Sequence, residues 1–253
     1  MKILVCIKQV PDTEANPELR RDLSWINEDN LAFRMNRYDE YALEEALVIK
    51  DEFPETVIDV ITVGPERSAA IIRKGLEKGA DSAVHIKTAE NHISAADTAS
   101  LIADYASGRG YDIIFAGVMS EDMMQCMVGP MVASLLSMPC IVSVVKTSVD
   151  FDSGIITAES ELEGGIIETV ELSAPCLITI QTGINQPRYP SLSNVMKARG
   201  MTHQTVEADH FIKNRVSSLS YPERGAKGTE ITGSIEEKAD KLVELLYERG
   251  LLV

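Results

Sequence analysis

Residues 159–199 read ESELEGGIIETVELSAPCLITIQTGINQPRYPSLSNVMKAR. Two apolar runs within this stretch, Gly165–Leu172 and Cys176–Ile180, have the composition of buried β-strands. The polar segment Asn185–Leu192 follows them and leads into a short helix over Ser193–Ala198. Because it sets one Tyr and one Leu among Asn, Gln, Arg, Ser and two prolines, this segment has the composition of an exposed contact patch. A connector that merely turns the chain is the alternative.

Strands and helices alternate along the chain that leads to this stretch. The predicted strands are Lys2–Val10, Val57–Val63, Ala83–Ile86, Tyr111–Ala116 and Cys140–Val145. The predicted helices are Glu40–Glu52, Arg67–Lys78, Ser94–Ser107 and Val128–Leu136. Elements of this length in alternation predict an α/β fold with a doubly wound, mostly parallel sheet.

The helix Glu40–Glu52 has a clear apolar face. That face consists of Ala42, Leu43, Ala46, Leu47 and Ile49. Asn36 or Asp39 is placed to cap the helix N-terminus. The neighbouring carboxylates Glu44 and Glu45 are interpreted as solvated surface charges rather than an acid and base pair.

The periodic pattern weakens after Arg199, which divides the chain into residues 1–200 and residues 201–253. The first part is a nucleotide-binding α/β domain by this interpretation, and the second is an arm with a C-terminal helix. Helical periodicity over Ser234–Arg249 begins with the spacing of a capping box, Ser234 and Glu237. Such a tail packs on a partner subunit or folds back on its own domain.

Composition excludes several classes of function. The chain has 24 Lys and Arg against 39 Asp and Glu, a net charge of −15, which disfavours binding to nucleic acid or to anionic membranes. No apolar run approaches the roughly 20 residues of a membrane helix, and the N-terminus reads as a strand rather than a signal peptide. We therefore expect a cytoplasmic protein. The four scattered cysteines indicate reduced thiols.

The carboxyl ends of the predicted strands indicate one binding crevice. The first predicted strand supplies Cys6, the end of the second supplies Val63, and the loop Gly117–Val128 follows the fourth. Asn36–Asp39 would close the crevice from the side. Backbone N–H groups at the start of the helix from Val128 would suit a nucleotide phosphate, although many doubly wound domains leave this end empty. The sequence shows neither a P-loop nor a GxGxxG motif, and no metal-ligand spacing, so no catalytic residue and no metal site is predicted.

Two adjoining motifs resemble a known family. The segment ELEGGIIETVELSAPCLIT, Glu161–Thr179, resembles the signature of the electron transfer flavoprotein β subunit. The segment NQPRYPSLSNVMKA, which begins at Asn185, resembles the recognition loop of that family. The resemblance extends from Lys2 to about Arg199 and implies an adenine nucleotide α-hydrolase-like, Rossmann-like fold. Ser160 departs from the family pattern, which usually has Lys or Arg just before the signature.

The resemblance implies a nucleotide in the crevice: AMP in simple members, or a second FAD in electron-bifurcating ones. The redox-active FAD would be held chiefly by a separate α subunit. The positions that match the family's nucleotide site are Cys6, Asn36, Arg37, Tyr38, Asp39, Val63, Gly117, Met119, Ser120, Asp122, Met123, Met124, Gln125, Cys126, Met127 and Val128. Relatives usually carry small or polar residues where this chain has Met123–Met127, which leaves AMP, FAD and an empty site all open.

The resemblance also implies partners and a role. Leu192 matches the family's anchor for acyl-CoA dehydrogenase-type flavoenzymes, with Tyr189, Met196 and Lys197 beside it. The chain would be an electron-carrier subunit that works with an α subunit, and also with NADH and ferredoxin if it bifurcates electrons. The alternative is a stand-alone adenine-nucleotide-binding α/β protein without a redox role.

Overall fold

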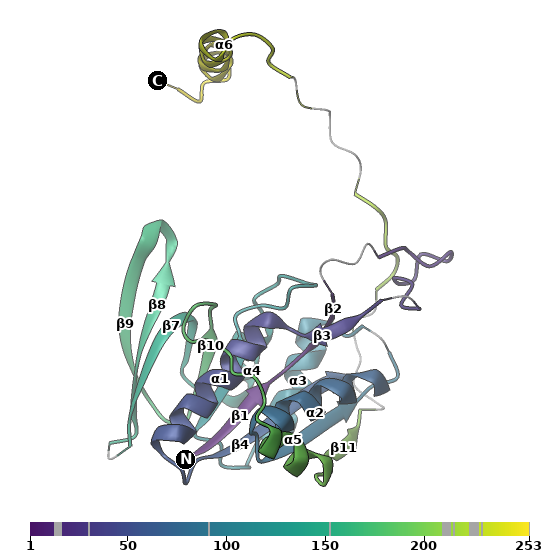
Figure 1. The fold of residues 1–253 in the computed structure, drawn as a ribbon, viewed down its shortest axis with the longest axis vertical. Coiled ribbons are helices and arrows are strands. Elements are labelled where there is room, and N and C mark those ends of the chain that lie inside the picture. The colour runs from purple at the N-terminus through teal and green to yellow at the C-terminus, as the bar shows by residue number, and fades with distance from the viewer. Residues whose placement is uncertain are drawn as a thin grey trace. The chain divides into compact units, whose positions relative to one another are not determined.

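The structure is a computed structural model that describes residues 1–12, 17–29, 31–90, 92–151, 153–208, 214, 216–222, 228 and 230–252. The chain separates into two compact units, Met1–Ser218 and Leu219–Val253. Figure 1 shows the ribbon of both units.

A single large sheet forms the centre of the first unit. Within the described residues it has nine strands in the order β11-β5-β4-β1-β6-β10-β7-β8-β9. Neighbouring strands from β11 to β7 pair in parallel, while β8 and β9 are antiparallel. The strands are β1 (Lys2–Cys6), β4 (Val57–Gly64), β5 (Ser82–Lys87), β6 (Ile113–Gly117), β7 (Cys140–Asp150), β8 (Ile155–Leu162), β9 (Ile166–Ser173), β10 (Cys176–Ile180) and β11 (Gln204–Glu207). The predicted doubly wound, mostly parallel sheet is confirmed.

Helices cover both faces of the parallel part of this sheet. One face carries α1 (Arg37–Glu52), α2 (Ala69–Lys78) and α5 (Leu192–Arg199), and the other carries α3 (Ala95–Ala106) and α4 (Val128–Leu136) (Figure 1). The 3₁₀ turns η1 (Glu66–Ser68) and η2 (Glu163–Gly165) and the short antiparallel pair β2 (Gln9–Pro11) and β3 (Phe33–Met35) complete the unit.

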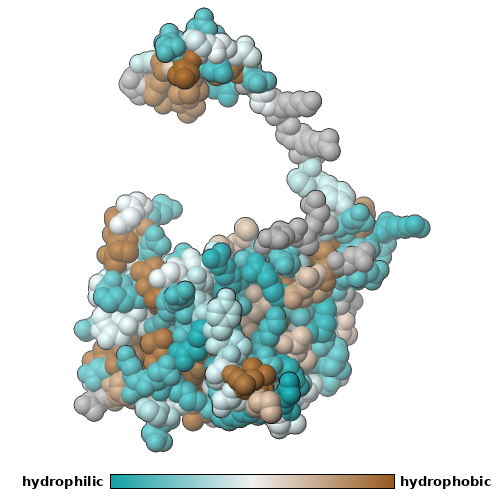
Figure 2. All heavy atoms as spheres, in the orientation of Figure 1, coloured by the Kyte–Doolittle hydropathy of each residue, from teal (hydrophilic) through white to brown (hydrophobic). Residues whose placement is uncertain are grey.

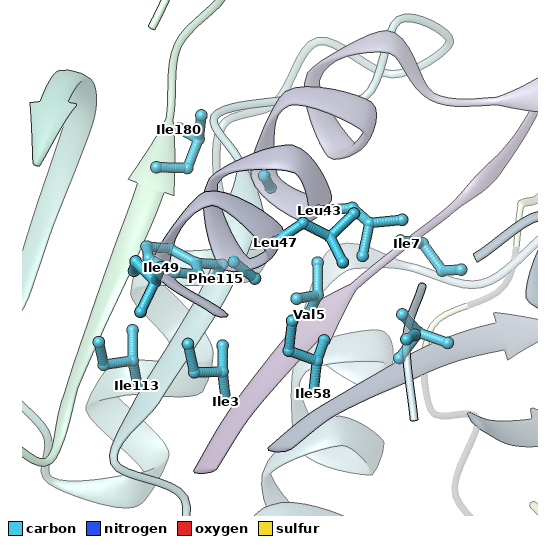
Figure 3. Close-up of a cluster of buried hydrophobic side chains, with 14 of the residues drawn as sticks. Ile3, Val5, Ile7, Leu43, Leu47, Ile49, Ile58, Ile113, Phe115 and Ile180 are labelled. Atoms are coloured by element: carbon cyan, nitrogen blue, oxygen red, sulfur yellow. The ribbon is translucent and has the colours of Figure 1, made fainter. Parts of the chain in front are cut away.

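Alternate residues of the central strands fill two hydrophobic cores. Ile3 and Val5 of β1 face α1, whereas Leu4 and Cys6 face α3 and α4. Figure 3 shows the first core, in which Leu43 and Leu47 of α1 lie against the sheet. The predicted apolar face of this helix is confirmed, since all five of its residues are buried.

The strand order places the predicted binding crevice at the carboxyl ends of β1 and β6. From β1 the chain moves outward through β4 and β5, and then returns to add β6 on the other side of β1. Connections therefore leave these two neighbouring strands toward opposite faces of the sheet. In doubly wound sheets ligands bind at such a point of reversal.

Two local expectations are wrong. The apolar run of β9 is not buried: Ile166 is 60% exposed, because β8 and β9 form an antiparallel hairpin at the end of the sheet. Figure 2 shows hydrophobic surface on this hairpin. The first strand ends at Cys6 rather than Val10, and the chain then leaves the sheet for β2. Beyond Arg199, the short strand β11 pairs with β5 and so extends the sheet.

The second unit contains α6 (Ile235–Glu248), and the predicted capping box between Ser234 and Glu237 is present. Several of its apolar side chains are exposed, among them Ile235, Leu242, Val243 and Tyr247. In the described part of the chain, no helix is long and apolar enough to cross a membrane.

Candidate functional site: a crevice and a contact loop held by helix α1

The first turn of α1 is tied to the loop that follows β6. Asn36 is buried, donates through Nδ2 to the carbonyl oxygen of Met119 at 2.9 Å, and accepts from the backbone N–H of Glu121 at 3.1 Å. The side chain of Asn36 makes no hydrogen bond that caps α1. Asn36 thus occupies the predicted N-cap position, but its side chain, like that of Asp39, joins the helix to neighbouring segments instead of capping it.

Asp39 joins three segments at the bottom of the crevice. Its buried carboxylate accepts from the backbone N–H of Lys8 at 2.7 Å and from that of Gly117 at 3.1 Å. Burial raises the pKa of this carboxyl to about 7, against the opposing effect of its hydrogen bonds and of the Lys8 charge. Asp39 thus fixes the carboxyl ends of β1 and β6 to α1.

Gly117 is needed here because the helix comes close to the end of β6. A Cβ atom at this position would lie 2.6 Å from Cβ of Tyr38 and 2.9 Å from its carbonyl carbon, and would also collide with the Asp39 carboxylate. Such distances leave no room for a side chain. Any larger residue would push the first turn of α1 away from the strand.

Ion pairs hold the acidic residues of the loop after β6. Lys8 Nζ lies 2.7 Å and 2.8 Å from the two carboxylate oxygens of Asp122 and 3.2 Å from Ser120 Oγ. Glu121 accepts from Arg34 Nη2 at 3.1 Å and from the backbone N–H of Arg37 at 3.2 Å. These contacts neutralise the carboxylates that would otherwise repel an anionic ligand.

The end of the same loop exposes backbone donors. The N-cap residue of α4, Met127, makes no side-chain capping bond. Pro130 has no N–H and the Met131 N–H donates to the Met127 carbonyl oxygen at 3.0 Å, so the donors at this helix start are the N–H groups of Val128 and Gly129. Met124 and Cys126 just before it adopt positive φ values of 50° and 53°. Together with the Lys8 amine, these donors fit a nucleotide phosphate.

The methionines give this loop an apolar surface. Met124 and Met127 are 68% and 46% exposed, whereas Met123 is half-buried. Polarizable, flexible side chains of this kind suit a flat aromatic ring. The residues present therefore fit a nucleotide, with phosphate contacts through the backbone and ring contacts through methionine.

The remaining predicted residues lie around this centre. Cys6 and Val63 end the adjacent strands β1 and β4, and burial, followed by the charge of Asp39, raises the pKa of the Cys6 thiol. Arg37 is exposed and Tyr38 half-buried on the first turn of α1, while Gln125 is exposed in the loop. The structure thus brings residues from β1, β4, β6 and α1 to one edge of the sheet.

The segment Asn185–Leu192, which we call the contact loop, crosses the outer side of α1 and exposes apolar residues. Tyr189 is 95% exposed and Leu192 is 79% exposed, and Met196 and Lys197 are exposed on α5. Ser191 caps α5 by accepting from the backbone N–H of Asn194 at 3.1 Å, so the helix begins one residue earlier than predicted.

The base of this loop rests on Glu44 and Glu45. Glu44 binds Arg188 and Glu45 binds Asn185, and both glutamates are at most 6% exposed. Our interpretation of these glutamates as solvated surface charges is therefore wrong. Their partners lie about 140 positions away in the sequence, so no local pattern of α1 could have indicated this burial.

Sequence reasoning missed Lys8, Glu121 and Arg188. Lys8 was missed because the predicted strand extended to Val10 and so placed this residue inside the sheet, whereas β1 ends at Cys6 and Lys8 follows it at the carboxyl end. Nothing in the sequence of α1 indicated that its polar side chains would be buried.

Among the described residues, no cluster of His, Cys, Asp and Glu could hold a metal ion. His85 is buried in β5, where its Nε2 lies 2.9 Å from the Gly64 carbonyl oxygen, in keeping with a structural role.

Comparison with known proteins assigns the family. The electron transfer flavoprotein domain matches residues 24–210. The chain is 34% identical to the electron transfer flavoprotein subunit beta of Methylophilus methylotrophus, with 98% of each chain covered, and 31% identical to that of Bacillus subtilis over the whole of both. It is also 31% identical, over the whole of both chains, to the Caffeyl-CoA reductase-Etf complex subunit CarD of Acetobacterium woodii. The chain therefore belongs to the family of electron transfer flavoprotein β subunits.

Proposed function

We propose that this chain forms a heterodimer with an electron transfer flavoprotein α subunit and carries electrons between acyl-CoA dehydrogenase-type flavoenzymes and another redox partner. The observation that carries the proposal is the combination, on one helix, of a nucleotide crevice at the first turn of α1 and an apolar contact loop on its later turns. A stand-alone nucleotide-binding protein would need only the first of these surfaces.

The crevice would hold a nucleotide, AMP or a second FAD. The backbone N–H groups that begin α4 would receive its phosphate, Lys8 would add a positive charge, and Met124 and Met127 would contact a ring. Gly117 and Asp39 would keep the crevice in shape without touching the ligand. AMP would have a structural role, whereas a second FAD would supply redox chemistry.

The α subunit would hold the redox-active FAD, and this chain would supply the base on which that subunit moves. The exposed apolar side of α6 and the outer hairpin β8–β9 are surfaces suited to the α subunit. The domain boundary after residue 200 and a cytoplasmic location stay predictions.

The contact loop would bind the partner enzyme. Leu192 projects from a capped helix start and Tyr189 is almost fully exposed, so both would enter an apolar surface without first leaving a core. Such anchors would hold the flavoenzyme while the flavin-bearing part of the α subunit moves. NADH and ferredoxin become partners only if the crevice holds a second FAD.

Co-purification tests the proposal directly. The chain is expressed with the α subunit encoded in the same genome, and the complex is mixed with an acyl-CoA dehydrogenase from that organism and butyryl-CoA. A yellow heterodimer whose flavin is reduced only when the dehydrogenase is present supports the proposal. A colourless monomer that binds adenine nucleotide and ignores the α subunit contradicts it and supports the stand-alone alternative.

A further inference from the structure

We propose that Glu44 and Glu45 are positioning residues for partner recognition, which hold the base of the contact loop on α1 so that Tyr189 and Leu192 are presented in a fixed place. The inference rests on the proposed docking role of the loop. It assigns to two buried carboxylates a task that neither the core nor the nucleotide crevice requires.

The carboxylate of Glu44 binds both the backbone and the side chain of Arg188. Its carboxylate accepts from the Arg188 backbone N–H at 2.9 Å and from Nε at 2.9 Å, and it lies 2.8 Å from Nη2. The same Nη2 lies 2.8 Å from the carboxylate of Asp51, about two helical turns further along α1. These hydrogen bonds to Glu44, followed by those to Asp51, raise the pKa of the guanidinium. Main chain and side chain of Arg188 are thus fixed together.

Glu45 fixes a second point of the loop, three residues earlier. Its carboxylate accepts from Asn185 Nδ2 at 2.8 Å, and the same Nδ2 also donates to the Tyr41 carbonyl oxygen at 3.0 Å. On its other side Glu45 accepts from the hydroxyl of Thr147 on β7. Two anchored residues on either side of Pro187 restrict the orientation of the backbone between them.

This arrangement is costly for folding alone. Burial raises the pKa of Glu45, and the neighbouring charges of Glu44 and Glu52 add to that effect. Apolar residues at these two positions would extend the buried face of α1 without placing adjacent charges out of water. Buried, fully hydrogen-bonded carboxylates instead favour a single position for the loop.

A fixed loop lowers the cost of docking. Tyr189 and Leu192 are 95% and 79% exposed, so their own packing does not hold them in place. A loop that moved freely would have to be ordered by the partner, and binding would lose that free energy. Glu44 and Glu45 therefore act on affinity for the partner rather than on the electron-transfer step.

The test compares Glu44→Gln with Glu52→Gln in the heterodimer. Both replace a glutamate of α1 by its neutral isostere, but Glu52 is exposed and serves as the matched control. In Glu44→Gln we expect hydrogen exchange in the peptide covering residues 185–192 to accelerate about tenfold, with residues 117–127 unchanged. We also expect the KM for an acyl-CoA dehydrogenase partner to rise about tenfold, while kcat and flavin content stay within twofold.

Three further variants keep the test decisive. If Glu44→Gln fails to fold, Arg188→Gln removes the same contact from the loop side, where the residue is part of no core. The double variant of Glu44 and Arg188 should raise the KM and the exchange rate no further than either single variant does, because each single variant removes the same interaction. Unchanged exchange and unchanged KM in both single variants would overturn the proposal. If Leu192→Ala also leaves the KM unchanged, the docking role itself fails, whereas an effect of Leu192→Ala alone would reject only the positioning role.

Discussion

The loop after β6 and the loop after β10 leave neighbouring strands, yet α1 holds them by different means. At the first turn of α1, Asn36 and Asp39 bind backbone groups of the first loop, and Gly117 lets the helix lie directly on its strand. Further along the helix, Glu44 and Glu45 hold the second loop through Arg188 and Asn185. The first contact depends on close packing and the second on charge, so different substitutions should break each.

Gly117→Ala should have the largest effect and should break only the first contact. The added methyl group must displace Tyr38 and Asp39, so we expect a loss of about 1–3 kcal/mol in the free energy of unfolding and a loss of the nucleotide bound by this chain. Thermal unfolding and nucleotide content of the purified heterodimer measure both. Gly200→Ala is the matched control, because the nearest atom to its added Cβ is 3.7 Å away. Equal nucleotide content in the two variants would separate Gly117 from the crevice.

Leu192→Ala should weaken binding of the partner flavoenzyme to the loop after β10 without affecting the loop after β6. An exposed anchor that enters a partner's apolar pocket contributes about 1–2 kcal/mol, which is roughly a tenfold rise in the KM for the partner flavoenzyme. Because Leu192 is 79% exposed, the free energy of unfolding should change by less than about 0.5 kcal/mol. Leu135→Ala, an exposed position on α4, is the control and should leave the KM unchanged. A KM equal to that of the wild type would remove Leu192 from the docking surface.

Asp39, at the first turn of α1, should make the free energy of unfolding depend on pH. Its pKa of about 7 in the folded protein lies above the ordinary value of 3.8, so between these values the folded state binds more protons than the unfolded chain. Through this group the free energy of unfolding therefore falls as pH rises from about 4 to about 7, by at most about 1.4 kcal/mol per pH unit. Denaturant titrations of the wild type and Asp39→Asn across this range should show the wild type losing stability relative to the variant as pH rises. Parallel profiles would show that Asp39 does not titrate in this window.

Lys8→Gln should have the smallest effect, a modest loss of nucleotide affinity at the loop after β6. The ion pair of Lys8 with Asp122 is partly exposed, so its loss should cost less than about 1 kcal/mol of stability. The nucleotide would lose a nearby positive charge and regain the repulsion of Asp122, which should weaken its binding severalfold. Calorimetric titration of the nucleotide-free heterodimer with AMP measures this affinity, and Lys146→Gln on β7, which breaks the ion pair with Glu159, is the control. Equal affinities in the two variants would mean that the phosphate does not approach Lys8.

The sequence was informative where local patterns decide the structure. The buried strands β4, β6 and β10 and the apolar face of α1 are continuous or periodic runs of apolar residues, and their predictions are confirmed. The candidate crevice could be placed because parallel strands bring their carboxyl ends to one edge.

Contacts between distant residues could not be predicted in the same way. The charges of Glu44 and Glu45 predict solvated side chains. Both can be buried because the chain returns at Asn185 and Arg188, whose side chains bind the two carboxylates. The exposure of β9 has a similar origin, because an apolar run does not reveal whether another layer will cover it. Asn36 and Asp39 look like caps, yet their partners belong to the loops after β1 and β6.

Counting nucleotides in the co-purified heterodimer tests the central claim, that the first turn of α1 and the loop after β6 form a nucleotide site. FAD and AMP are released by denaturation and quantified per heterodimer in the wild type and in Gly117→Ala. We predict one FAD held with the α subunit and one further nucleotide, AMP or FAD, that is lost in the variant. One FAD and no second nucleotide in the wild type, or a second nucleotide that persists in Gly117→Ala, would contradict this account.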